Sequence, residues 1–361
     1  MRILFYDNGR PFNLDTPYET HLGGSETSLI LLAKGLSELG HTVYICNNYS
    51  TNDSANNEII LRSNLFTMET LQECDLIICN RSFPNGLQNF IGKKRIYYFS
   101  HDAYDQHLIC DWIYKYDILQ ILNGFFCVSE WQKNTFFKYF KIPSSLFHKF
   151  HIIGNPLDLS LYYGYSERNK NKLIYSSIPY KGLEILPALF DDICIQSKKD
   201  DLELHVFSSM KLYYNDDGKS DEKYDDIFST LRNMKNVFLH DLVSMKRLAY
   251  EFSTSNLYIH PNLYHETFGM VLTQCQAAGC LPITTNKGAV NEVIKNNSTG
   301  FIVDYPNIEN IDCYKIYINK ICELLESYDA LYKNRLEAQE WAKQFDYLKL
   351  AKKMEEVLLE T

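Results

Sequence analysis

The chain of 361 residues lacks any run of 18 consecutive apolar residues, the length that a membrane-spanning helix needs. Its first residues, MRILFYDNGR, lack the apolar stretch and the small-residue cleavage site of a signal peptide. The formal net charge is −9, and basic residues are outnumbered by acidic ones both up to Asp158 and after it. This balance disfavours a nucleic acid as the main partner. We therefore expect a cytoplasmic protein that neither spans a membrane nor binds nucleic acid.

Paired cysteine spacings are missing as well, although the chain has 10 cysteines. No C-x2-C pair occurs, so the usual spacing of zinc sites and thioredoxin-like sites is absent. Most of the cysteines lie in apolar runs, which favours buried, reduced thiols over metal or redox chemistry. We therefore expect no metal site.

Two nucleotide-binding fingerprints are also absent. No G-x-G-x-x-G follows the first predicted strand, and no G-x-x-x-x-G-K-[ST] occurs anywhere. The first absence argues against a dehydrogenase that binds NAD. The chemistry must therefore come from other residues.

Short apolar runs alternate with longer segments of helical periodicity, and this alternation occurs twice. The predicted strands of the first series are Arg2–Tyr6, Thr42–Cys46, Leu76–Cys79, Ile96–Ser100 and Phe125–Val128. Its predicted helices are Glu26–Leu39, Leu65–Glu73, Tyr104–Ile121 and Glu130–Phe140. Such an order, with nearly continuous apolar strands, predicts a parallel sheet with helices on both faces.

The second series begins after the Gly154-Asn155-Pro156 turn and the polar stretch Tyr165–Lys172, which is typical of a linker. Its predicted strands are Leu173–Ser176, Leu204–Phe207, Val237–His240, Leu257–His260, Pro282–Thr285 and Phe301–Val303. Its predicted helices are Leu183–Gln196, Asp221–Met234, Ser244–Phe252, Thr267–Ala278 and Asn291–Ile294, and Asn310–Leu359 is helical by periodicity. We predict an α/β protein with two doubly wound domains, residues 1–158 and 159–340, followed by a C-terminal helix at 341–361. Ligands of such sheets bind beyond the carboxyl ends of the strands.

Three segments near strand ends could serve a ligand or be ordinary structure. Gly23-Gly24 lets a backbone approach a ligand closely, or is a plain loop before a helix that Ser25 caps. His101-Asp102 follows a buried strand, where a histidine acts as an acid, a base or a purely structural group. Lys181, before Gly182 at a helix start, indicates a phosphate site or a solvent-facing lysine.

The segment from His260 to Ile294 is the most informative. Glu266 and Phe268-Gly269 precede a predicted helix that carries Gln274. A glycine inside a helix costs roughly 1 kcal/mol relative to alanine, which is understandable where N–H groups must face a ligand. A buried helix with a small-residue packing face explains the small residues at 277–279 but neither Glu266 nor Gly269.

Together these motifs resemble the retaining family 4 glycosyltransferases. The signature of that family is a glutamate, F-G, a second glutamate eight residues after the first, and A-x-A-x-G-x-P. Here it corresponds to Glu266, Phe268-Gly269, Gln274 and Ala277–Pro282. The other correspondences are Gly23-Gly24, FCVSEWQKNTF (126–136), IIGNPLDLSLY (152–162) and Gly288 with Glu292. The resemblance covers about residues 1–304, with the motifs in the family's order.

The resemblance implies the GT-B fold, in which two Rossmann-like domains face each other across a cleft and a C-terminal helix returns to the first domain. It implies transfer of a hexose-type sugar, with retention of configuration, from a nucleoside-diphosphate sugar, with UDP or GDP expected. The acceptor would be a glycan, a lipid-linked acceptor or a protein, and neither a catalytic metal nor a cofactor is expected. The first domain would hold the acceptor and the second the donor.

The resemblance also implies residue roles. The catalytic residues would be His101, Lys181 and Glu266, with Lys181 on the leaving diphosphate and the other two on the donor sugar. Asp102 would orient His101 or contact the acceptor. The nucleobase of the donor would be bound near the strand ends of the second domain, at Leu239–Leu242. The residues expected to bind the donor are Gly23, Gly24, Ser176, Ser177, Phe268, Gly269, Met270, Val271 and Gln274.

Two departures from the family pattern keep alternatives open. Ser176 stands where the family often has an arginine, which Lys287 or Arg10 would have to replace. Gln274 stands where a glutamate contacts the donor ribose, although an amide can both accept and donate a hydrogen bond. The alternatives are an inactive nucleotide-sugar-binding GT-B protein and another GT-B enzyme such as a nucleotide-sugar epimerase.

Residues 131–150 combine lysines with Trp131 and several phenylalanines. This composition is typical of a surface that docks on an anionic bilayer. It is also expected of a helix that packs its aromatic side chains inward and keeps its lysines in water. Peripheral membrane contact therefore stays open.

Overall fold

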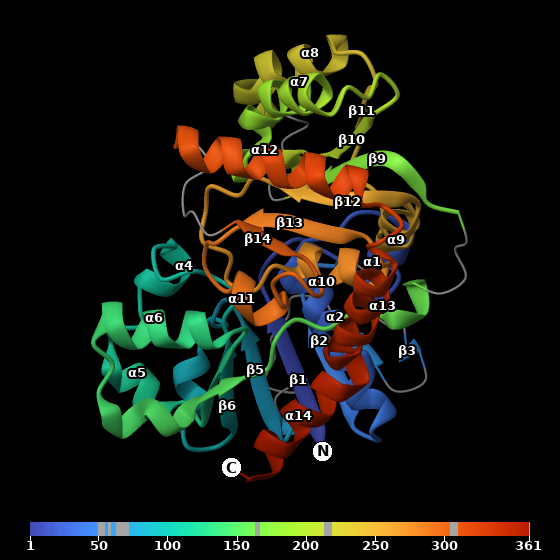
Figure 1. Ribbon diagram of the computed structural model, residues 1–361. Coiled ribbons are helices and arrows are strands. Elements are labelled where there is room, and N and C mark those ends of the chain that lie inside the picture. Colours follow the sequence, from blue (N-terminus) through green and yellow to red (C-terminus); the bar gives the residue numbers. More distant parts are fainter. Residues whose placement is uncertain are drawn as a thin grey trace. The chain divides into compact units, whose positions relative to one another are not determined.

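The computed structural model describes residues 1–49, 55–56, 59–62, 72–162, 167–212, 219–303 and 310–360. These residues form two compact units, each built around its own sheet (Figure 1). The first unit consists of Met1–Thr16, Gly24–Asp158 and Gln344–Thr361, and the second of Pro17–Gly23 and Leu159–Lys343. The chain thus passes from the first unit to the second after Asp158, and its C-terminal segment belongs to the first unit.

The sheet of the first unit has eight strands in the order β3-β4-β2-β1-β5-β6-β7-β8, and every neighbouring pair except β3-β4 is parallel. The strands are β1 (Arg2–Asp7), β2 (Thr42–Cys46), β3 (Ala55–Asn56), β4 (Ile59–Arg62), β5 (Leu76–Asn80), β6 (Arg95–Phe99), β7 (Gly124–Cys127) and β8 (Phe150–Ile152). The five predicted strands are confirmed, and β3, β4 and β8 are added at the edges. Because the strand order reverses between β1 and β5, the ends of these two strands flank the switch point of the sheet.

The helices of the first unit differ from prediction at one place. They are α2 (Gly24–Glu38), α4 (His107–Cys110), α5 (Tyr116–Ile121), α6 (Glu130–Phe140) and α14 (Tyr347–Glu360), with α1 (Thr16–Glu19) at the point where the units divide. The single helix predicted at Tyr104–Ile121 is wrong, because a turn at 111–115 separates α4 from α5 and places Trp112 and Ile113 in the core. Most of the predicted helix Leu65–Glu73 lies outside the described residues.

The aromatic side chains of residues 131–150 are divided between core and surface. Phe136 is fully buried in the core of the first unit, where Phe140 packs against it. Tyr139 and Phe147 are exposed to 50% and 39%, and Phe147 stacks on Phe137 with ring centroids 3.8 Å apart. Inward packing therefore accounts for part of the aromatic pattern. None of the helices in the described ranges combines the length and the apolar character that crossing a bilayer requires.

The C-terminal helix α14 packs along α2 within the first unit (Figure 1). Gly35 of α2 faces Ala351 so closely that a Cβ on Gly35 would lie 2.5 Å from the Ala351 Cβ and 2.9 Å from the Tyr347 carbonyl oxygen. Tyr347 also donates to Glu38 at 2.8 Å, and Lys34 lies 4.5 Å from its ring centroid. The absence of a side chain at Gly35 thus fixes how near the two helices come.

We expect Gly35→Ala to destabilise the protein, although helix propensity alone predicts a gain of about 1 kcal/mol. The added methyl group would push α14 away from α2, and such overpacking typically costs about 1–3 kcal/mol. Denaturant unfolding of the wild type and the variant decides between these signs. A rise in the unfolding midpoint would show that α14 does not pack on α2 as described.

The sheet of the second unit has six parallel strands in the order β11-β10-β9-β12-β13-β14. The strands are β9 (Asn169–Ser176), β10 (Glu203–Phe207), β11 (Val237–His240), β12 (Ser255–His260), β13 (Leu281–Thr285) and β14 (Phe301–Val303). All six predicted strands are confirmed. The order reverses between β9 and β12, so this pair flanks the switch point of the second sheet.

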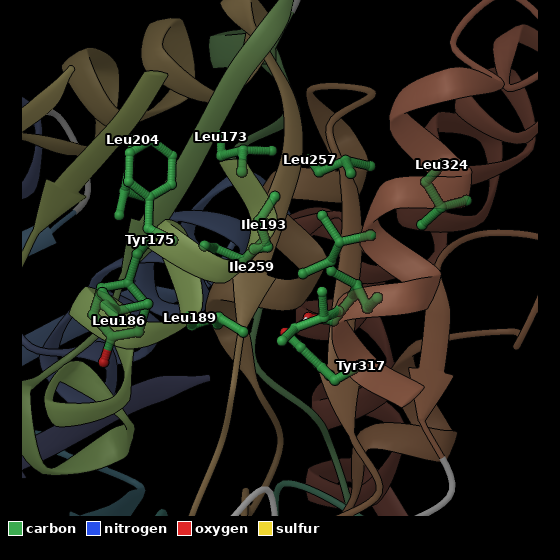
Figure 2. Close-up of a cluster of buried hydrophobic side chains, with 14 of the residues drawn as sticks. Leu173, Tyr175, Leu186, Leu189, Ile193, Leu204, Leu257, Ile259, Tyr317 and Leu324 are labelled. Carbon is green, nitrogen blue, oxygen red and sulfur yellow. The ribbon is translucent and has the colours of Figure 1, made fainter. Parts of the chain in front are cut away.

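The helices of the second unit surround this sheet. They are α7 (Leu186–Ser197), α8 (Asp225–Asn233), α9 (Met245–Thr254), α10 (Met270–Ala277), α11 (Val290–Val293), α12 (Ile311–Glu326) and α13 (Tyr332–Ala342). Figure 2 shows part of the core, where Leu173 and Tyr175 of β9 lie with Leu186 and Leu189 of α7. The helix predicted from Thr267 begins only at Met270, because Gly269 has a left-handed backbone with φ of 89°.

The cysteines behave as the apolar runs predicted. All 10 are free thiols, and all except Cys110 and Cys194 are buried. Burial raises the pKa of Cys46 to about 11, so this thiol is protonated at neutral pH. In the parts of the chain that the structure describes, no group of three or more His, Cys, Asp or Glu side chains could hold a metal ion.

Candidate active site

The switch point of the second unit brings together the two side chains that the sequence separated by 85 residues. Lys181 lies in a short 3₁₀ turn (Pro179–Lys181) after β9, and Glu266 lies in the loop after β12. The Lys181 Nζ donates to Glu266 Oε1 at 2.7 Å. Parallel neighbouring strands end at the same edge, so the two loops meet there. The predicted catalytic pair is thus a direct ion pair.

The environment of Glu266 keeps its carboxylate charged. The side chain is only 8% exposed, and burial by itself would raise its pKa. The Lys181 ammonium, with a contribution from His260, more than offsets this and lowers the pKa of Glu266 below its ordinary value. A charged carboxylate held in a buried site is a strong acceptor for hydroxyl groups.

His260, the last residue of β12, lies against the carboxylate of Glu266. Its Nε2 lies 3.5 Å from Glu266 Oε1, and its Nδ1 lies 3.0 Å from the Thr284 hydroxyl. Burial, together with the charge of Lys181, lowers the pKa of His260 to about 4, so the ring is neutral at pH 7. The tautomer protonated on Nε2 directs an N–H toward the carboxylate. The sequence analysis gave His260 no role beside Glu266, although its position at the end of a predicted buried strand could have indicated one.

Two glycines bring the loops of the pair into place. A Cβ on Gly288 would lie 2.2 Å from the Glu266 carbonyl oxygen, which accepts from the Ala289 N–H at 2.7 Å. A Cβ on Gly182 would lie 2.3 Å from the carbonyl oxygen of Pro261. Both glycines have positive φ, 76° and 115°. Gly288, singled out by motif, therefore serves to hold the backbone of Glu266.

The other predicted donor-binding residues lie around this pair. Phe268 is buried, and Gly269 caps the first turn of α10, which begins with Met270 and Val271. Gln274 of α10 is 7% exposed, and its side-chain amide can both donate and accept hydrogen bonds.

The turn after β9 carries the two predicted serines. Ser176 ends β9, and its carbonyl oxygen accepts from the Tyr258 hydroxyl at 3.1 Å. The Tyr175 hydroxyl donates to the Ile178 carbonyl at 3.2 Å, across Ser177. Lys287, a predicted substitute for the missing arginine, donates to the Leu263 carbonyl at 2.7 Å. Its ammonium therefore helps to fix the loop that carries Glu266.

The switch point of the first unit holds His101. Its Nε2 lies 3.1 Å from Asn80 Oδ1, and Asn80 Nδ2 donates to Asp7 Oδ2 at 2.6 Å. Burial, with the nearby Arg81 guanidinium, lowers the pKa of His101 to about 3. The ring is therefore neutral at pH 7, and in the tautomer protonated on Nε2 it donates to Asn80 Oδ1. Asp7 and Asn80 end β1 and β5 and were missed, because their approach follows from strand order rather than from spacing.

Asp102 does not take the orienting role that the sequence suggested. Its buried carboxylate receives two hydrogen bonds from Arg81, at 2.7 and 3.0 Å, while the ring of His101 is held by Asn80. The Arg81 Nη1 also donates to Ser25 Oγ at 3.3 Å, at the start of α2. Asp102 pairs with Arg81 rather than with His101 because a guanidinium binds a carboxylate through two parallel hydrogen bonds, which an imidazole cannot offer.

The Gly23-Gly24 segment directly precedes Ser25, the residue that accepts from Arg81. Gly24 is the first residue of α2, and Ser25 donates through its hydroxyl to Glu26 Oε2 at 2.8 Å. Gly23 belongs to the second unit and Gly24 to the first.

Comparison with known proteins identifies the family. The profile described as "Glycosyl transferases group 1" matches residues 166–353, more than half of the chain, and this range includes Lys181 and Glu266. Curated protein sequences give no match.

Solved structures with the same architecture match the whole chain. HepE (Alr3699) from Anabaena, in complex with UDP-glucose, has a TM-score of 0.72 at 17% identity over 100% of both chains. The pneumococcal O-GlcNAc transferase GtfA, in complex with UDP and GlcNAc, has a TM-score of 0.73 at 11% identity over 100% of this chain and 99% of its own. Sucrose-phosphate synthase from Thermosynechococcus elongatus has a TM-score of 0.72 at 14% identity, over 99% and 98%. At such identities the likeness shows the fold, which is GT-B, and the profile match shows that the chain belongs to the glycosyl transferases group 1.

Proposed function

We propose that the chain transfers a hexose from a nucleoside-diphosphate sugar to a hydroxyl group, with retention and without a catalytic metal. The observation that carries this proposal is the buried Lys181–Glu266 pair at the switch point of the second sheet. It joins a cation suited to a phosphate with a charged carboxylate suited to sugar hydroxyls. UDP is the first nucleotide to test, since HepE and GtfA are both seen with UDP.

In the proposed reaction the bond between the anomeric carbon and the diphosphate oxygen breaks. A new bond forms from the same carbon to the acceptor oxygen, and the acceptor proton passes to the leaving diphosphate. Lys181 and the N–H groups at Gly269–Val271 stabilise the charge that develops on that diphosphate. Entry of the acceptor oxygen on the same face as the departing diphosphate accounts for retention without a covalent nucleophile.

The other side chains orient the sugar. Glu266 accepts from the donor hydroxyls, and its charge is preserved by Lys181. Neutral His101 binds the sugar near the reacting carbon, and Gln274 uses its amide for the ribose hydroxyls in place of a glutamate. Each role uses a hydrogen-bonding state that holds at neutral pH.

We also propose peripheral contact with an anionic membrane through residues 131–150. It is supported by the exposed rings of Tyr139 and Phe147 and by Lys138, whose ammonium lies 5.4 Å from the Tyr139 ring centroid. Sedimentation with vesicles of phosphatidylglycerol, compared with vesicles of phosphatidylcholine, tests it.

The proposal is tested by incubating the pure protein in EDTA with UDP-, GDP-, ADP- and dTDP-sugars. We expect one donor to raise the melting temperature and to be hydrolysed slowly without an acceptor. A ligand at 100 times its Kd adds about 2.7 kcal/mol of stability, which a melting curve detects readily. Released nucleotide and the anomeric configuration of the product are read by chromatography and NMR.

Three other results would point elsewhere. Binding of a donor without turnover, under every acceptor tried, would favour an inactive binding protein. Conversion of the donor sugar to its epimer would favour an epimerase. Loss of activity in EDTA that Mg²⁺ restores would contradict metal independence.

A further inference from the structure

Two buried tyrosine hydroxyls bond to the backbone segment that carries Lys181. Tyr175 of β9 and Tyr258 of β12 are both fully buried. The Tyr258 hydroxyl donates to the Ser176 carbonyl oxygen at 3.1 Å, where this segment leaves the sheet. The Tyr175 hydroxyl donates to the Ile178 carbonyl oxygen at 3.2 Å, and the same oxygen accepts from the Lys181 N–H at 3.0 Å. The carbonyl that closes the turn of Lys181 is therefore also held by a side chain from the core.

The two hydroxyls come from opposite faces of the sheet. Tyr175 belongs to the core cluster beneath α7, as do Leu257 and Ile259 of β12 (Figure 2). Because successive side chains of a strand point to opposite faces, Tyr258 between these two residues lies on the other face. There its ring meets Phe252 of α9 edge to face, with 5.7 Å between the ring centroids. The segment that carries the lysine is thus held from both sides.

The hydroxyl groups are not needed to fill the core. A phenylalanine at either position would supply the same ring, whereas a buried hydroxyl costs free energy unless it is hydrogen-bonded. Burial raises the pKa of both phenols, so each stays protonated and can donate. What the hydroxyls of Tyr175 and Tyr258 add to the packing of their rings is a fixed position for the backbone between Ser176 and Lys181.

We propose that Tyr175 and Tyr258 are positioning residues of the transfer reaction, whose hydroxyls hold the turn of Lys181 in place. This inference rests on the proposed function, in which Lys181 stabilises the charge that develops on the leaving diphosphate. Such a group is effective when it is already in place before the bond breaks, because no reorganisation is then needed during the reaction. Glu266 holds the ammonium at 2.7 Å, and the two hydroxyls hold the backbone from which it extends.

Two conservative variants test this role, since Tyr175→Phe and Tyr258→Phe remove only the hydroxyl. A displacement of about 1 Å can cost roughly 10²-fold, so for the smaller shift caused by one lost hydrogen bond we expect kcat of donor hydrolysis to fall about 10-fold. The KM for the donor should change less than about threefold, as for an interaction that acts in the transition state. Released nucleotide is measured well below the melting temperature of each variant.

Tyr314→Phe is a matched control. The Tyr314 hydroxyl of α12 donates to Asp192 at 2.6 Å, and neither residue belongs to the proposed site. Its loss removes one tyrosine hydrogen bond from the same unit, so we expect kcat to stay within about twofold, as for a substitution away from the site.

Combination with Lys181→Ala shows whether the tyrosines act through the lysine. In that background we expect Tyr175→Phe or Tyr258→Phe to change kcat less than about twofold, because the group that they position is gone. A general disturbance of the fold would instead lower kcat by the same factor with and without the lysine. A purely structural role therefore predicts a different result.

Amide hydrogen exchange tests the same contact without turnover. In Tyr175→Phe we expect faster exchange in a peptide that covers residues 177–183, which includes the Lys181 N–H, and unchanged exchange in peptides of α12. The inference is overturned if this exchange is unchanged, if both phenylalanine variants keep the wild-type kcat, or if their losses recur in full in Lys181→Ala. Failure of the proposed function differs from all three, since the wild type itself would then turn over no donor, and exchange alone would decide whether the hydroxyl of Tyr175 holds the turn.

Discussion

Replacing Lys181 with alanine is expected to reduce turnover of the donor by about 10²–10³-fold, the usual effect of removing one group that stabilises developing charge. The lysine is the cation at the switch point of the second sheet, and Glu266 holds it at 2.7 Å. The loss should appear in kcat of donor hydrolysis and of transfer alike, because both break the bond to the diphosphate. Stopped assays of nucleotide release measure it.

The same variant is expected to lose about 3 kcal/mol of stability at pH 7, since it leaves a buried carboxylate without its cation. The wild-type pKa of Glu266 is lowered, so the stability that this group contributes is present above its ordinary pKa of 4.5 and is lost as the pH falls through the folded-state value. In Lys181→Ala burial is opposed only by the smaller effect of His260, so we expect the pKa of Glu266 to rise and the sign to reverse. The difference between the two proteins should therefore shrink as the pH falls from 7 to 4, which denaturant unfolding measures.

Lys172 offers a matched control in the same unit. It forms a buried ion pair with Glu251 at 2.5 Å and bonds to the Thr254 hydroxyl at 3.0 Å, and both partners lie on α9, which carries no proposed site residue. Lys172→Ala should lose stability but keep kcat within about twofold. The double variant Lys181→Met with Glu266→Gln should regain stability and remain inactive. Full activity of Lys181→Ala would contradict the proposed site.

The arrangement of the sheets could be predicted because parallel strands buried on both faces are nearly continuous apolar runs. Every predicted strand is present. The errors occur where tertiary packing decides, as at Trp112, whose burial converts one apparent helix into two short ones. The late start of α10 follows from the backbone of Gly269, which no hydrophobic pattern reveals.

The site was predictable to the extent that its residues follow strands in a recognisable order. Lys181 and Glu266 were found by motif, and their contact follows from the adjacency of β9 and β12. The contact between Asp7 and Asn80 depends on β1 lying beside β5, 73 residues apart in the chain, which periodicity does not reveal. The same holds for the pairing of Arg81 with Asp102, which displaced the expected role of Asp102.

Gly288→Ala is expected to abolish most of the activity through the position of Glu266. A Cβ at residue 288 would lie 2.2 Å from the Glu266 carbonyl oxygen and 2.5 Å from its nitrogen, so the backbone that carries the carboxylate must move. A displacement of about 1 Å in a catalytic group can cost roughly 10²-fold. We expect a loss of that size in kcat, measured well below the melting temperature of the variant.

Gly40→Ala separates this steric effect from backbone strain. Gly40 has φ of 87°, close to the 76° of Gly288, but a Cβ there would meet nothing within 4 Å. An alanine in this conformation costs about 1–2 kcal/mol from strain alone, so Gly40→Ala should lose that much stability and keep its activity. Gly288→Ala should lose more stability than Gly40→Ala, and the excess measures the contact with Glu266. If Gly288→Ala keeps activity within about threefold while Lys181→Ala does not, the diphosphate contact is essential but the position of Glu266 is not, and the sugar-binding role of this carboxylate has to be given to another residue.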